Sequence, residues 1–189
     1  MSSADYLGIL LLVVGGGYLI YQSVVAIRMY RRMRGKMVVT CPETKKPAAV
    51  RVAAGKAALQ AALGAPGLQL SECSRWPEKQ ACGQECLEQI EAAPKDCLVW
   101  AIVNRWYEGQ SCAYCHETFG ELHWHDHRPA LMSEDGKTVQ WTEIPAERIR
   151  HVLATHRPVC WNCHITETFR RENPELVVDR RPSPRRIHL

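Results

Sequence analysis

Phenylalanine is almost missing from this sequence. The 189 residues include two phenylalanines but nine cysteines, and no repeat of solenoid length occurs. A domain with so few large apolar side chains has a thin core, and small domains of this kind often gain stability from bound metal. The composition therefore favours a cysteine-rich protein stabilised by metal.

The sequence also lacks the motifs of nucleotide-dependent enzymes. It contains no Gly-rich phosphate loop and no Gly-rich dinucleotide-binding turn. Cys115 and His116 are adjacent, but neighbouring side chains rarely face one another, so this pair does not indicate a nucleophile with its base. We name no catalytic residue, and a role other than catalysis is favoured.

A third absence is charge between Tyr6 and Ile27. An apolar run of about 20 residues is long enough to cross a bilayer as a helix. No Lys or Arg precedes this run, whereas five basic residues follow it, namely Arg28, Arg31, Arg32, Arg34 and Lys36. Because positive charge is retained in the cytoplasm, we expect a single-pass protein of the cell membrane with its N-terminus outside and a cytoplasmic C-terminal domain. A cleaved signal peptide is the competing interpretation, but it requires a basic region ahead of the apolar run.

The remaining charge is distributed unevenly. The chain carries a formal charge of +4. The basic residues after the apolar run and the arginines of the tail together carry more positive charge than this, so residues 37–179 are mildly acidic. This balance argues against a nucleic-acid surface. The positive charge stands where anionic lipid headgroups would meet it, which makes membrane lipids an expected partner.

The pattern Cys-x-x-Cys-His occurs at Cys112-Ala-Tyr-Cys115-His116 and again at Cys160-Trp-Asn-Cys163-His164. The four cysteines, here called the C-terminal thiol set, could hold one tetrahedral Zn²⁺. With His116 and His164 the motifs also resemble those of c-type cytochromes, which implies two covalently attached haems. Covalent haem attachment belongs to the far side of the membrane in that family, so the expected cytoplasmic location favours metal.

A Cys-x-x-Cys turn, a hairpin and a second Cys-x-x-Cys at the start of a helix resemble the treble-clef and zinc-ribbon modules. The resemblance covers residues 110–171 and implies a closed four-thiolate zinc site. The gap between the two pairs is longer than the usual about 15 to 20 residues, so an inserted hairpin and helix must be accepted.

Four further cysteines, here called the N-terminal thiol set, could form a second site: Cys41, Cys73, Cys82 and Cys86. Their spacing matches no strong zinc signature. The interpretations left open are zinc, an iron–sulfur cluster, which also takes four thiolates with irregular spacing, and unliganded redox thiols. Cys97 could replace one member or pack as a small apolar group. Three alternating histidines, His123, His125 and His127, could bind a transition metal or haem, or could line a solvated strand edge.

Local patterns predict an α+β fold. They indicate strands at 37–40, 48–53 and 138–141 and helices at 55–63, 97–107 and 145–155, with a further helix starting at the second Cys pair. The expected organisation is an anchor with its basic flank at 1–36, a cysteine-rich subdomain at 37–108, the zinc module at 109–176 and a disordered basic tail at 177–189.

The whole chain resembles bacterial membrane-anchored metal-binding proteins. Our favoured interpretation is a structural or adaptor protein that binds zinc and docks on another membrane or cytoplasmic protein. The alternative is an electron-transfer protein with two c-type haems or an iron–sulfur centre. A third hypothesis is a thiol-based metal or redox sensor, whose Cys pairs release metal on oxidation.

Overall fold

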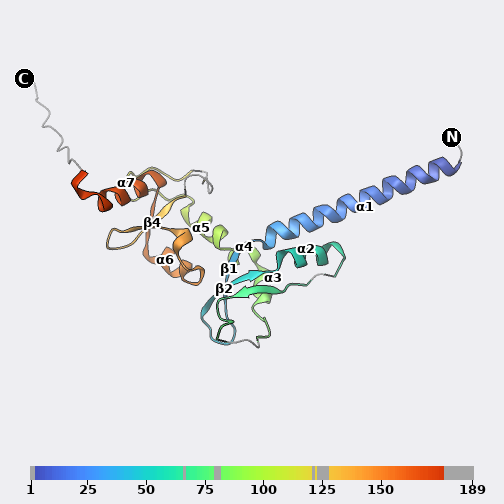
Figure 1. Cartoon of the computed structure of the whole chain (residues 1–189), viewed down its shortest axis with the longest axis horizontal. Coiled ribbons are helices and arrows are strands. Elements are labelled where there is room, and N and C mark those ends of the chain that lie inside the picture. Colours follow the sequence, from blue (N-terminus) through green and yellow to red (C-terminus); the bar gives the residue numbers. More distant parts are fainter. Residues whose placement is uncertain (1–2, 66, 79–81, 121, 123–127, 177–189) are drawn as a thin grey trace, which may run out of the picture. The chain divides into compact units, whose positions relative to one another are not determined.

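A computed structural model describes residues 3–65, 67–78, 82–120, 122 and 128–176 (Figure 1). The chain divides into two compact units. Unit 1 comprises Met1–Arg105 and Pro145–Arg150, and unit 2 comprises Trp106–Ile144 and His151–Leu189. Helices and two small sheets occur together, which confirms the α+β prediction. The predicted tail at 177–189 and the three alternating histidines lie outside the described residues.

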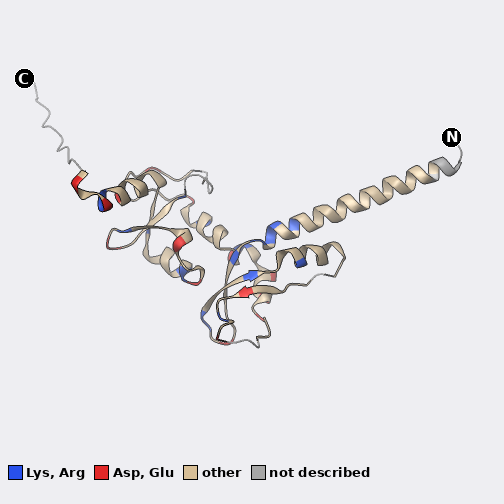
Figure 2. Ribbon diagram, viewed as in Figure 1, with Lys and Arg blue, Asp and Glu red and all other residues tan. Residues whose placement is uncertain are grey.

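Unit 1 begins with the long helix α1 (Ser3–Met33). Its segment Gly8–Met33 is long and apolar enough to cross a membrane, and none of its most apolar stretch is buried inside the protein. Figure 2 shows Lys and Arg at the C-terminal end of this helix. Met33, in the last turn, is buried in the core of unit 1 and so joins the helix to the domain.

A three-stranded antiparallel sheet of order β1-β2-β3 forms the centre of unit 1. Its strands are β1 (Lys36–Thr40), β2 (Pro47–Val52) and β3 (Leu70–Cys73). β2 buries alternate residues, and the three central residues of β1 are all buried. Helix α2 (Ala54–Ala62) connects β2 to β3 and packs beside α1.

Three short helices complete the chain of unit 1 before its boundary. They are α3 (Leu87–Ala92), α4 (Pro94–Cys97) and α5 (Val99–Tyr107). The one helix expected at 97–107 is interrupted, because Leu98 is extended and bridges to Met37 of β1. Both side chains are buried in the unit 1 core, so a long-range contact prevails over the local helical pattern.

Unit 2 contains a second antiparallel sheet, of order β5-β4-β6. The strands are β4 (Ala130–Met132), β5 (Thr138–Gln140) and β6 (Arg157–Val159). The helices and helical turns after β5 are η1 (Trp141–Glu143), η2 (Ala146–Arg148), α6 (Ile149–Thr155), α7 (Trp161–Glu172) and η3 (Pro174–Leu176). Of these, η2 and the first two residues of α6 belong to unit 1. The helix expected at 145–155 therefore begins as a 3-10 turn after Pro145.

Tyr107 organises the interior of unit 2. Its side chain is fully buried, and its hydroxyl donates a 2.6 Å hydrogen bond to the Ala130 carbonyl of β4. Its ring meets Phe119 edge-on, with the ring centroids 4.9 Å apart. A buried aromatic ring with a satisfied hydroxyl contributes apolar packing without the cost of an unpaired polar group. One of the two phenylalanines is thus placed beside β4 and the first Cys-x-x-Cys turn.

Candidate metal centre

The C-terminal thiol set comes together in unit 2. The Sγ atoms of Cys112, Cys115, Cys160 and Cys163 all lie within 4.8 Å of one another, and the Sγ atoms of Cys115 and Cys160 are 3.8 Å apart. A tetrahedral Zn²⁺ with Zn–S bonds of about 2.3 Å holds its sulfur atoms about 3.8 Å apart. None of these cysteines is in a disulfide. The geometry therefore fits a single ion bound by four thiolates.

The first pair lies on a tight turn that is closed by two backbone hydrogen bonds. The Cys112 N–H donates to the Glu117 carbonyl, and the His116 N–H donates to the Cys112 carbonyl, each over 2.9 Å. His116 has a φ of 61°, in the left-handed region. The Ala113 N–H donates to the Pro158 carbonyl of β6, which holds the turn against the segment that leads into the second pair.

The second pair lies at the start of α7. Cys160 is the N-cap residue, with extended backbone, and Cys163 is in the first turn. The Cys160 N–H donates to the Cys112 Sγ over 3.3 Å. Free N–H groups and the positive end of the helix dipole both stabilise negative charge on nearby sulfur. One Cys pair thus lies on a tight turn and the other at the start of a helix.

The surroundings of Cys112, Cys160 and Cys163 change the pKa values of these thiols in different directions. Burial and the neighbouring sulfur atoms raise the pKa of Cys163, and burial raises that of Cys160. Burial also acts on Cys112, but N–H donors from Cys160, Cys115 and Tyr114 outweigh it and lower its pKa to about 7. Several thiolates so close together repel one another unless a cation is bound between them. A metal ion can therefore take the place of the thiol protons.

The two histidines of the motifs occupy different environments. His164 is buried, and its Nδ1 lies 2.8 Å from the Thr138 hydroxyl of β5, whereas His116 is exposed on its turn. Two covalent haems would need the two Cys pairs to bind separate porphyrins, yet all four sulfur atoms form one group. The geometry thus favours one shared ion over the haem alternative, and His164 acts in packing.

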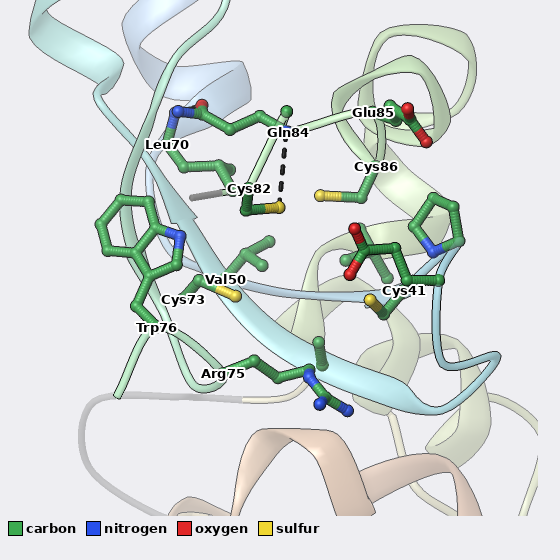
Figure 3. A pocket seen from close by; sticks show the side chains of 15 residues that line it. Cys41, Val50, Leu70, Cys73, Arg75, Trp76, Cys82, Gln84, Glu85 and Cys86 are labelled. Atoms are coloured by element: carbon green, nitrogen blue, oxygen red, sulfur yellow. Dashed lines mark hydrogen bonds between the residues drawn. The ribbon is translucent and has the colours of Figure 1, made fainter. Parts of the chain in front are cut away.

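The N-terminal thiol set lines a cavity of about 40 Å³ in unit 1. Figure 3 shows the side chains of Cys41, Cys73, Cys82 and Cys86 directed towards the same space. They do not form as close a group as the thiols of unit 2, the one cluster of this kind found among the described residues. Burial and the charges of Cys73, Cys82 and Cys41 raise the pKa of Cys86 to about 11.

Cys97 belongs to neither thiol set. It is buried in the unit 1 core, its Sγ lies 3.6 Å from the Gln89 carbonyl, and it does not line the cavity. Burial raises its pKa. Of the two roles expected for this residue, the structure therefore supports a buried apolar thiol.

Sequence reasoning missed two residues beside the thiols. Thr44 follows Cys41 at the same spacing at which Cys115 follows Cys112, and its hydroxyl and N–H lower the pKa of Cys41. Gln84 donates its N–H to the Cys82 Sγ over 3.4 Å. The shared spacing of the two turns was a visible signal for Thr44, whereas nothing in the sequence marked Gln84.

The comparisons with known proteins add no relative. No protein-family model matches the chain, and searches among curated proteins and solved structures found no match.

Proposed function

We propose that this chain is a membrane-anchored structural or adaptor protein whose C-terminal thiol set binds one Zn²⁺. The observation that carries the proposal is the convergence of four cysteine Sγ atoms within 4.8 Å of one another. Four protein thiolates fill a tetrahedral zinc site and leave no position for substrate or water, so the ion acts in folding rather than in catalysis. It fastens the turn at Cys112 to the start of α7.

The anchor in this proposal is α1, and lipids contact its exposed apolar side chains. The basic residues at its C-terminal end hold that end in the cytoplasm, where the domain docks on another membrane or cytoplasmic protein. Thiols stay reduced in the cytoplasm, which suits metal binding rather than disulfides. The free state of all nine cysteines agrees with such a location.

Zinc content of the full-length protein, purified in detergent under reducing conditions, tests the proposal. We expect zinc bound to the wild type, loss of about one zinc per chain in Cys163→Ser, and no covalent haem. Structural zinc binding is coupled to folding, so this variant should also lose several kcal/mol of metal-dependent stability. Cys97→Ser is the matched control, because Cys97 lies in neither thiol set and its substitution leaves the zinc in place. Unchanged zinc in Cys163→Ser, or haem staining on a denaturing gel, would refute the proposal.

A further inference from the structure

Unit 1 contains a turn with the same backbone geometry as the turn that carries Cys112. The Cys41 N–H donates to the Lys46 carbonyl over 2.9 Å, and the Lys45 N–H donates to the Cys41 carbonyl over 2.8 Å. The corresponding bonds at Cys112 join the same relative positions and are both 2.9 Å long. Lys45, like His116, has a positive φ, here 56°. Two turns in separate units thus share their hydrogen bonds and their unusual backbone conformation.

The turn at Cys41 also matches the turn at Cys112 in residue spacing. Thr44 lies three residues after Cys41, which is the spacing at which Cys115 follows Cys112. Arg75 donates to the Thr44 oxygen over 2.9 Å and lines the same cavity, so positive charge lies beside the sulfur atoms.

The other three thiols reach the cavity from separate segments. Cys73 ends β3, Cys82 accepts the Gln84 N–H, and Cys86 immediately precedes α3. Gln84 also accepts a 2.9 Å hydrogen bond from the Leu70 N–H at its side chain, and this bond ties the Cys82 segment to β3. Three separate segments therefore place the sulfur atoms of Cys73, Cys82 and Cys86 at the cavity (Figure 3).

We propose that Cys41, Cys73, Cys82 and Cys86 hold a second thiolate-bound metal centre, in unit 1. Cys41 comes from a turn equivalent to the one for which we propose zinc binding in unit 2, and Cys73, Cys82 and Cys86 take the places of the other three thiols of that site. The cavity supplies the space, and Arg75 offsets part of the negative charge that four thiolates carry. This centre is independent of the zinc in unit 2, because the two thiol sets share no residue and lie in different units.

The spacing of the thiols bears on the kind of centre. A single Zn²⁺ draws four sulfur atoms to about 3.8 Å apart, and the N-terminal set is more open than that. Zinc therefore requires the four sulfur atoms of this set to move closer together. An iron–sulfur cluster spreads four thiolates over several metal atoms and needs no such closure. Both centres use the same four ligands, and elemental analysis separates them.

The test compares metal content between matched variants of the full chain, purified anaerobically in detergent. The double variant Cys73→Ser, Cys82→Ser should lose either about one zinc per chain or iron together with acid-labile sulfide and visible absorbance. It should retain the zinc of the C-terminal set, which shows that unit 2 has folded. Cys163→Ser should give the reverse pattern, and Cys97→Ser should retain both centres. Metal content equal to the wild type in the double variant would overturn the proposal.

A measurement on the unaltered protein covers the case in which the double variant fails to fold. Alkylation by iodoacetamide, followed by mass spectrometry, should leave Cys41, Cys73 and Cys82 protected in the native protein although all three are partly exposed. After treatment with a metal chelator the same thiols should become reactive. Rapid alkylation of all three before chelation would overturn the proposal even if the zinc of unit 2 is present, so the two sites fail separately.

Discussion

Among the described residues, Lys45, Gln84 and His116 are the non-glycine residues with a positive φ, a backbone conformation that normally favours glycine. Lys45 and His116 close equivalent turns with φ values of 56° and 61°. The left-handed conformation costs a residue with a Cβ about 1 to 2 kcal/mol, a cost that glycine does not incur. Both residues remain in this conformation because the two hydrogen bonds of each turn fix the backbone around the cysteine.

Lys45→Gly should therefore stabilise the protein. We expect the free energy of unfolding to rise by about 0.5 to 1 kcal/mol, because relief of the left-handed strain exceeds the extra freedom that glycine gives the unfolded chain. Chemical denaturation of the detergent-solubilised protein measures the change. The matched control is Lys46→Gly, which removes the same charge one residue later, where φ is not positive, and should give no gain. Equal effects of the two substitutions would show that charge, not backbone strain, is responsible.

His164 is the residue whose role differs most from its expected one. As part of a Cys-x-x-Cys-His motif it was a haem ligand or a surplus neighbour of zinc, but it is buried against Thr138. Burial keeps its imidazole neutral by lowering its pKa. A neutral ring nitrogen that is hydrogen-bonded to a hydroxyl can be buried without an unpaired polar group, so the side chain of His164 holds α7 to β5.

His164→Ala should destabilise unit 2 by about 1 to 3 kcal/mol, through a lost hydrogen bond and a small cavity. Thermal unfolding checks this, with the exposed His151→Ala as control, for which we expect a change within about 0.5 kcal/mol. In a double-mutant cycle with Thr138→Val, part of the loss should be shared by the two positions. Zinc content should be unchanged. Loss of zinc without loss of fold would instead make His164 a ligand.

At the scale of elements, local patterns were reliable where a segment depends on its own neighbours. The strand expected at 37–40 appears as β1, and the helix expected at 55–63 appears as α2 with bounds Ala54–Ala62. Both follow from side-chain periodicity, which the sequence displays directly. The start of the last helix at the second Cys pair was also foreseen, because α7 begins at Trp161.

Local patterns failed where a distant strand competes for the backbone. The helix expected at 97–107 does not begin at Cys97, because Pro94 starts the short helix α4 and Cys97 is the last residue of that helix. Leu98 then leaves the helical conformation to bridge to β1. No local pattern carries information about a partner 61 positions away, so the interruption could not be inferred from residues 87–107 alone.

At the scale of the whole molecule, the open question is which side of the membrane carries the two units. All five basic residues flank the C-terminal end of the apolar segment, so we expect the C-terminus in the cytoplasm. A green fluorescent protein fused after Leu189 should fluoresce, and alkaline phosphatase at the same position should be inactive. Replacement of the five basic residues by alanine should mix the two orientations. An active phosphatase fusion of the unaltered protein would reverse the topology and restore the haem interpretation.

The division into units also depends on long-range contacts. Pro145–Arg150 belongs to unit 1, although it lies in the sequence between strands of unit 2. Arg150 donates a 2.7 Å hydrogen bond to the Asp96 carbonyl, which accounts for part of this attachment. The organisation expected from the sequence, 37–108 followed by 109–176, is consecutive, and a consecutive division cannot represent a segment that returns to an earlier unit.

The sequence by itself determined the apolar segment and its basic flank, the mixture of helices and strands, and the residue types available for metal binding. These properties depend on composition and on spacings of a few residues. Tertiary structure decided which thiols meet: it gathers Cys112, Cys115, Cys160 and Cys163 within 4.8 Å and buries Cys97 in the core. It also pairs His164 with Thr138. Such contacts join residues far apart in the chain, and packing of the strands and helices between them sets the distances.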